Sequence, residues 1–306
     1  MHTNDCESCI RGGLVGAVIG DALGLPGNNK SSIQINLATG GRGISGISVA
    51  PINGVPELVT RPTANTAMLF EIIESIVERR GIDHAVIAAI INRCTPNRTV
   101  NDNTLAKAVL PIAMFRAIVV GTQQQAQMAI EDDLQKINES LGLSVATVTG
   151  ATAAAIALLW PMLVGRISMR HENTAAMFEA VVRRTKSDDE SASQIYDAFL
   201  RTARLVVEKE SLSNLKGKMT CGSLVWQSLP FSLLVFMLEP REFDMSLGIT
   251  VNAGGDASGN GVLVGGLMGV NGGLDGITQE WFDALPEAKR MDELACRLIG
   301  VAKECS

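Results

Sequence analysis

Hydrophobic residues recur along most of this chain at intervals of three and four positions, the spacing that places them on one face of an α-helix. In the segment Thr66–Arg80, Met68, Ile72 and Ile76 share one face, charged residues occupy the others, and the pattern ends at Gly81. Strict alternation of hydrophobic and polar residues, which is typical of half-buried β-strands, is nearly absent. The pattern therefore predicts an all-α fold, a compact bundle of many helices.

The same spacing predicts further helices with short breaks between them. Their expected ranges are Asp83–Ile91, Thr104–Val119, Gln123–Ser140, Ala151–Val164, Asn173–Arg184, Ser191–Glu208, Phe243–Ile249, Gly261–Val270 and Met291–Lys303. The region Ser31–Glu57 mixes Gly, Ser, Ile and Val without a clear period, and we expect a long, partly ordered loop there. Because the sequence shows no fixed repeat and no linker, residues 11–306 are expected to form one domain, preceded by a flexible tail over residues 1–10.

Two series of glycines stand at helical spacing. One comprises Gly12, Gly16, Gly20 and Gly24, and the other comprises Gly261, Gly265, Gly269 and Gly273. Each glycine inside a helix costs about 1 kcal/mol relative to alanine, so eight of them need a reason. A stripe of glycine lets another backbone approach closely. We expect two central helices that contact each other and bring the loops at their ends together.

Composition narrows the range of partners. The chain carries 26 Lys and Arg against 32 Asp and Glu, a net charge of −6, so its overall field does not attract nucleic acid or anionic membranes. The longest apolar run, Ala151–Gly165, contains Pro161 and is shorter than the ~20 residues of a membrane span. The N-terminal apolar run is interrupted by Asp21, unlike a signal peptide. We expect a cytoplasmic protein with no membrane partner.

The cysteines and histidines give little chemistry. Cys6 and Cys9 stand near His2, but a zinc site needs a fourth ligand, and reduced thiols are the expectation. His84 and His171 lie in polar surroundings typical of surface residues.

Three segments resemble the signature motifs of the ADP-ribosylglycohydrolase family. They read GGLVGAVIGDALGLP, PTANTAML and NAGGDASGNGVLVGGLMGVNGGLDGI, and a weaker fourth match is DNTLAKAVLP, which contains Asn103. Their order and spacing fit the family along nearly the whole chain. The resemblance implies an all-α domain with a two-magnesium site, in a cleft where the bond between ADP-ribose and a modified side chain is hydrolysed.

The sequence departs from the family at the metal ligands. Where the family has Thr-Asp-Asp, this chain has Thr63, Ala64 and Asn65, and where the family has Asp-Thr-Asp-Thr it has Asp256, Ala257, Ser258 and Gly259. Asp256 alone remains of four carboxylates. Two magnesium ions bring four positive charges, which one carboxylate and neutral oxygens cannot balance. We therefore expect no metal cofactor, although a single Mg²⁺ could bind with a substrate phosphate, with Thr63, Asn65, Asp256 and Ser258 as residual ligands.

The remaining polar residues of these motifs are candidates for catalysis or ligand binding. Asp256 is either a helix cap or a surviving ligand, and Asp21 is either a solvent-facing acid or a group in the cleft wall. Both are kept as candidate catalytic residues. An acid such as Glu57 or Asp102 could also replace a lost ligand. Backbone N–H groups at a helix start could hold a phosphate, and the candidate ligand-binding residues are Asn103, Gly254, Gly255, Ser258, Gly259 and Asn260.

Three functional hypotheses follow. The first is an ADP-ribosylglycohydrolase-like protein impaired in hydrolysis, which binds an ADP-ribose-like molecule or an ADP-ribosylated protein in the old cleft. The second is an active hydrolase of an ADP-ribosyl or related glycosidic bond with one metal ion or none. The third is a structural or interaction protein, as in the crystallin branch of the family.

Overall fold

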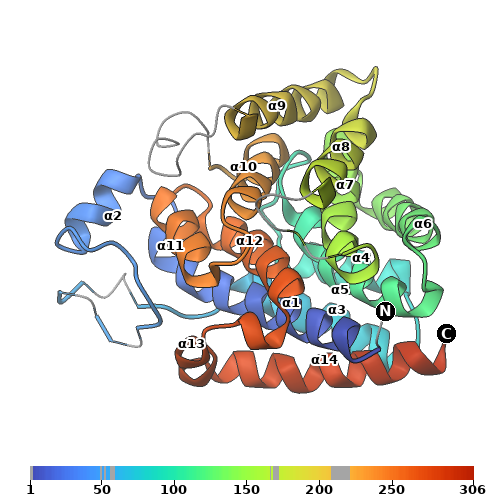
Figure 1. Cartoon of the computed structure of the whole chain (residues 1–306), viewed down its shortest axis with the longest axis horizontal. Helices are drawn as coiled ribbons and strands as arrows, with labels where there is room; N and C mark the ends of the chain where they lie inside the picture. Colours follow the sequence, from blue (N-terminus) through green and yellow to red (C-terminus); the bar gives the residue numbers. More distant parts are fainter. Residues whose placement is uncertain are drawn as a thin grey trace.

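The structure is a computed structural model that describes residues 3–48, 50–51, 53–55, 59–165, 167, 172–207 and 221–306. Its helices are α1 (Thr3–Gly24), α2 (Ser32–Ala38), α3 (Ala64–Arg79), α4 (His84–Cys94), α5 (Thr104–Val120), α6 (Gln123–Leu141), α7 (Val145–Leu163), α8 (Glu172–Thr185), α9 (Glu190–Val207), α10 (Val225–Leu238), α11 (Phe243–Ala253), α12 (Ala257–Gly272), α13 (Gln279–Ala284) and α14 (Pro286–Glu304), with short 3₁₀ turns η1 (Leu25–Gly27) and η4 (Leu274–Gly276). The described residues form no β-strand, only isolated bridges between Ser31 and Gly254 and between Asp102 and Leu224. The all-α prediction is confirmed (Figure 1).

The two glycine series form the contact between α1 and α12. Gly12 packs on Gly269, Gly16 on Gly265 and Gly20 on Gly261, so residue numbers fall along α12 as they rise along α1. The two helices are therefore antiparallel neighbours, and they lie side by side through the middle of the molecule (Figure 1). The backbones approach so closely that a Cβ atom at any of these positions would meet the backbone of the other helix at under 3.0 Å. The contact expected from glycine spacing is confirmed.

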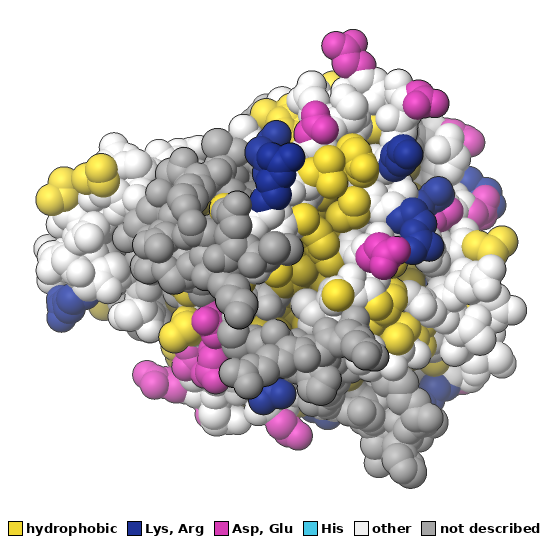
Figure 2. Space-filling view, turned by 45° about the horizontal axis from the view of Figure 1, so that its top comes forward, with side chains coloured by type: hydrophobic (Ala, Val, Ile, Leu, Met, Phe, Trp, Pro, Cys, Tyr) yellow, Lys and Arg dark blue, Asp and Glu magenta, His cyan; other side chains and the backbone are white. Residues whose placement is uncertain are grey.

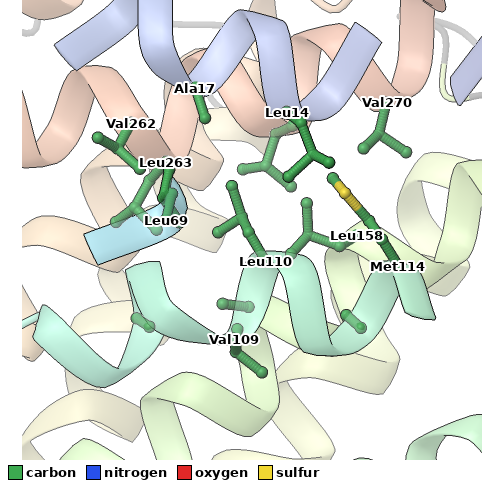
Figure 3. Close-up of a cluster of buried hydrophobic side chains, with 14 of the residues drawn as sticks. Leu14, Ala17, Leu69, Val109, Leu110, Met114, Leu158, Val262, Leu263 and Val270 are labelled. Atoms are coloured by element: carbon green, nitrogen blue, oxygen red, sulfur yellow. The ribbon is translucent and has the colours of Figure 1, made fainter. Parts of the chain in front are cut away.

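Apolar side chains from α5 and α7 cover this pair. In Figure 3, Leu14, Leu110, Met114 and Leu158 converge between α1, α5 and α7, and all four are buried. Two helices, Cys6–Gly27 and Val145–Leu163, have the length and hydropathy of a membrane span, but 83% of each apolar window is buried inside the protein. That degree of burial is typical of core helices.

Ion pairs attach α14 to the outside of the bundle. Arg11 of α1 donates two hydrogen bonds to Asp292, at 2.6 and 2.8 Å. Arg290 donates to Glu74 at 3.1 Å, and its guanidinium lies 4.5 Å from the centre of the Phe70 ring. The C-terminal helix is thus held against α1 and α3.

Several boundaries differ from the sequence-based prediction. The expected flexible tail over residues 1–10 is helical from Thr3, and Cys9 and Ile10 are fully buried, because α14 covers this end of α1. The expected loop Ser31–Glu57 contains α2, which begins with a capping box between Ser31 and Gln34. Within this loop Glu57 lies outside the described residues, as do His2 and His171 elsewhere in the chain.

The helix α10 has no counterpart in the prediction. Its sequence is apolar on every side, so it carries no periodic signal, and nearly all of its residues are buried. The helix α7 begins at Val145, earlier than the predicted Ala151, with Ser144 as its N-cap.

Candidate functional site

The candidate site lies where the C-terminal end of α1 meets the N-terminal ends of α3, α5 and α12. Gly24 packs on the backbone of Ala257 and Ser258 at the start of α12. Asp21, one turn earlier on α1, binds residues at the start of α3. Asn103, immediately before α5, binds Asp256, immediately before α12. All four sequence motifs, including the weaker match that contains Asn103, therefore meet at one end of the central helix pair.

Asp21 is fully buried, and its carboxylate caps α3 from a neighbouring helix. It accepts hydrogen bonds from the backbone N–H and hydroxyl of Thr63, both at 2.7 Å, and from the Asn65 amide at 2.9 Å. It also accepts bonds from the N–H of Thr66 at 3.3 Å and from its hydroxyl at 2.6 Å. These five donors fill the roughly four lone-pair positions of a carboxylate. Asp21 is therefore a buried acid that holds the start of α3 rather than a solvent-facing one, and its lone-pair positions are already engaged.

Asp256 is the N-cap of α12. Its carboxylate accepts a bond from the N–H of Gly259 at 3.2 Å and from the side-chain amide of Asn103 at 2.8 Å. Unlike Asp21 it is only partly buried. The capping role that the sequence left open is therefore present, in a residue that as a whole stays partly exposed.

Behind Asp256 lies a buried polar network. The Asn103 amide also donates to the Ser228 hydroxyl at 2.8 Å, and that hydroxyl donates to the Asn260 side-chain oxygen at 2.6 Å. The Asn260 amide then donates to the carbonyl of Cys221 at 2.8 Å, and the N–H of Asp256 donates to the same carbonyl at 2.9 Å. Asn103, Ser228 and Asn260 are at most 1% exposed. They hold the loop before α12 in place.

Asp102 serves α5 in the same way. Its carboxylate accepts bonds from the N–H groups of Thr104 at 2.9 Å and Thr99 at 3.0 Å, and the residue is 7% exposed. Asp21, Asp102 and Asp256 thus each cap one of the three converging helices. A carboxylate at a helix N-terminus is stabilised by the free N–H groups and by the helix dipole, and no metal is needed to explain any of the three.

Backbone N–H groups around the glycine pair are also engaged. The N–H of Gly255 donates to the carbonyl of Lys30 at 3.0 Å, and the N–H of Ser258 donates to the side chain of Asn28 at 2.8 Å. The amide of Asn28 returns a bond to the Ser258 hydroxyl at 2.8 Å. Asn28 and Ser228 are polar residues of this site that sequence reasoning missed, because neither lies in a recognisable spacing with its partner.

The residues present do not fit a dinuclear magnesium site. Ala64 offers no ligand atom, the Thr63 hydroxyl donates to Asp21 and accepts from the N–H of Asn65, and the Ser258 hydroxyl is bound to Asn28. The part of the chain that the structure describes contains no group of three or more His, Cys, Asp and Glu residues that could hold a metal ion. Magnesium needs several unengaged oxygen ligands with negative charge among them, and here the partly open carboxylate of Asp256 stands without a second one.

Two further groups are accounted for by their surroundings. Burial raises the pKa of the Cys221 thiol to about 12, so this residue beside the site is a poor nucleophile at neutral pH. His84, at the start of α4, lies 2.9 Å from the buried carboxylate of Asp133, which also receives two hydrogen bonds of 2.7 Å from Arg116. These three residues join α4, α5 and α6 away from the candidate site.

Comparison with known proteins agrees with the motif analysis. A family model described as ADP-ribosylglycohydrolase matches residues 2–306. A solved structure described as an "ADP-ribosylglycohydrolase-related protein complex" has a TM-score of 0.65 and covers 98% of this chain and 99% of that chain at 18% identity, which shows a shared fold. No curated protein matches the sequence. With a family model that spans the whole chain, the protein belongs to the ADP-ribosylglycohydrolase family.

Proposed function

We propose that this protein is a family member without the dinuclear magnesium site, impaired in hydrolysis of ADP-ribosyl bonds, that binds an ADP-ribose-like ligand or an ADP-ribosylated protein at the N-termini of α3, α5 and α12. The observation that carries the proposal is that the polar groups left in the metal-binding motifs are already engaged: Thr63 and Asn65 donate to the fully buried Asp21, and the Ser258 hydroxyl accepts from Asn28. Metal-assisted hydrolysis requires ligands that hold an ion and a water. The acids of this site instead hold helix ends.

Ligand recognition would fall to the groups that remain partly accessible at this end of the helix pair. Asn28, Thr63, Gly255 and Asp256 are partly exposed, and Ala64 is exposed. The partly exposed carboxylate of Asp256 accepts hydrogen bonds, so it suits the hydroxyl groups of a ribose better than a phosphate. The buried candidates Asn103, Gly254, Ser258, Gly259 and Asn260 act from behind, by positioning these groups.

Calorimetric titration of ADP-ribose with and without millimolar Mg²⁺ tests the proposal. We expect binding with the same affinity in both conditions, and no release of ADP-ribose from ADP-ribosyl-arginine or ADP-ribosyl-serine substrates. Tighter binding with magnesium, together with turnover, would overturn the proposal and favour the hydrolase hypothesis, with Asp256 as acid or base.

A matched pair of variants localises the binding. Asp256→Asn keeps the size of the side chain but removes its charge, and we expect weaker ADP-ribose binding. Asp283→Asn changes an exposed acid on α13 and serves as the control. Thermal unfolding of both variants checks that the loop before α12 is intact.

The second candidate function is the structural or interaction protein of the third hypothesis. It is favoured by the same saturation of polar groups, because a site whose donors and acceptors are already paired has little left for a ligand. A protein that shows no heat of binding and no thermal stabilisation with ADP-ribose would belong to this class, since a ligand that binds only the folded state raises stability.

A further inference from the structure

The short helix α2 carries a hydrophobic knob, formed by Ile33 and Leu37. These side chains stand one helical turn apart on the same face, and they are 71% and 78% exposed, more than any other large hydrophobic residue in the described part of the chain. The opposite face of α2 is anchored by the fully buried Ile35. The helix projects from one end of the body (Figure 1), and a small group of hydrophobic side chains stands at the tip of this projection (Figure 2).

An apolar pocket of about 460 Å³ lies under α11 and α13. Its floor consists of Leu23, Ile44, Val251 and Trp281, which are at most 7% exposed, and Met245 stands at its rim. The indole N–H of Trp281 lies close to Gly46 in the wall of the pocket. Pockets of this size accept groups of many heavy atoms, which includes two branched aliphatic side chains.

The charges around the knob and the pocket have opposite signs. The segment 28–48, which contains the knob, carries Lys30 and Arg42 and no acid. Arg42 lines one small pocket with Ser32 and Asn36 of α2 and another with Ser45 and Gly46, so it lies between the knob and the wall of the larger pocket. The larger pocket is itself lined by two acids, Glu280 and Asp244, and by no basic residue.

We propose that the knob of one copy of this chain inserts into the pocket of a second copy, and that the two copies form a closed two-fold dimer. The occupant is a second copy because this chain itself supplies both the exposed apolar group and the complementary basic charges. In a two-fold arrangement each contact occurs twice, so both knobs and both pockets are covered. Lys30 and Arg42 of one copy then face Asp244 and Glu280 of the other, which fixes the orientation.

Sedimentation equilibrium of the full chain over a range of concentrations tests the dimer. We expect a monomer–dimer equilibrium, and Ile33→Glu/Leu37→Glu is expected to weaken it at least about tenfold, because two buried apolar contacts per knob are lost. Met128→Glu, a change at a residue 63% exposed on α6, is the matched control and leaves the equilibrium unchanged. A monomer at all concentrations, or a mass that grows beyond the dimer, overturns the proposal.

A second set of variants tests the pocket independently of the knob. Gly248 lines the pocket, and a Cβ atom on it meets nothing within 4 Å, so the side chain of Gly248→Leu can extend into the pocket. This variant is expected to be a folded monomer. In a mixture with the Ile33→Glu/Leu37→Glu variant, the intact knob of one variant can enter the intact pocket of the other. The mixture should therefore dimerise more strongly than either variant by itself.

Charge exchange tests the orientation. Arg42→Glu and Glu280→Lys should each weaken the dimer, and the double variant should recover most of the loss. Additive losses in the double variant would mean that these side chains do not face each other across the interface.

Discussion

Gly20 and Gly261 lie directly against each other at the centre of the contact between α1 and α12, and each leaves no room for a Cβ atom on the other. This close contact holds α1 and α12 together as the central helix pair of the fold. Asp21, which binds the start of α3, directly follows Gly20, and Gly261 lies in the first turns of α12. A side chain at either glycine would push the two helices apart and so disturb the candidate site.

Gly20→Ala is therefore expected to destabilise the protein by at least about 2 kcal/mol, because the added methyl group forces the two backbones apart. Gly300→Ala is the matched control. Gly300 lies in α14 with nothing within 4 Å of an added Cβ, so this change should stabilise by about 0.5–1 kcal/mol through helix propensity. Urea unfolding measures both. Equal effects of the two substitutions would mean that the helices are not in close contact.

The central contact could be predicted from sequence because glycine repeated every four residues weakens a helix unless a second backbone packs against it. The cap at Asp256 could also be expected, since an acid after two glycines and before an apolar helix has a local signal. The contacts of Asn28 with Ser258 and of Ser228 with Asn260 could not be predicted. They join residues far apart in the chain, and a hydrogen bond across such a separation leaves no periodic trace.

The family motifs predicted the residues of the site but not the hydrogen bonds between them. They indicated which residues occupy the site, but not that Thr63, Asn65 and Thr66 all turn their donors toward Asp21. A missing carboxylate is visible in a sequence. The way in which the remaining groups pair with one another depends on the fold.

Removal of Arg116 should be costly although the residue lies outside the site. Arg116 donates two hydrogen bonds to the fully buried Asp133, and this contact raises the pKa of the guanidinium further. Arg116→Met leaves Asp133 buried with His84 as its remaining charged neighbour, and we expect a loss of about 3 kcal/mol. Arg183→Met breaks an exposed pair with Glu179 and should cost about 0.5 kcal/mol or less. If the two variants lost equal stability in denaturant titrations, the buried pair would contribute no more than a surface pair.

Cys221 should resist alkylation in the folded protein. With its pKa raised to about 12 by burial, on the order of one part in ten thousand of this thiol is ionised at pH 8. Iodoacetamide followed by peptide mass spectrometry should label the exposed Cys305 and leave Cys221 unmodified until the protein unfolds. Rapid native labelling of Cys221 would show that the segment before α10 opens, whose Cys221 carbonyl accepts a hydrogen bond from the N–H of Asp256.

The same shift predicts a pH dependence of stability. Folding raises the pKa of Cys221 from the ordinary value of 9.0 to about 12. Between these two pH values the thiol keeps its proton in the folded state and has lost it in the unfolded state. The contribution of this residue is therefore fully present below about pH 9 and decreases as the pH rises toward 12. Cys221→Ser should remove this part of the decrease in the free energy of unfolding, which denaturant titrations at pH 8 and pH 10.5 would detect.

Restoring the family's carboxylates should create a dependence on magnesium. Ala64→Asp, Asn65→Asp and Ser258→Asp return the acids expected at the two metal-binding motifs. Without metal, three new carboxylates beside Asp21 and Asp256 repel one another, so the triple variant should unfold at a lower temperature in EDTA than the natural protein. Millimolar Mg²⁺ should raise its melting temperature by several degrees, because an ion that binds only the folded state at 100 times its Kd contributes about 2.7 kcal/mol.

The matched control carries three new acids at exposed positions, Asn92→Asp, Asn97→Asp and Ser187→Asp. It has the same net charge as the triple site variant, so general screening by magnesium affects both equally. We expect Mg²⁺ to leave the melting temperature of the natural protein unchanged, and likewise that of this control. Stabilisation of the natural protein to the same extent as the site variant would show that Asp256 and its neutral neighbours suffice to bind the ion. In that case the loss of carboxylates in this chain would not have removed the metal chemistry of the family.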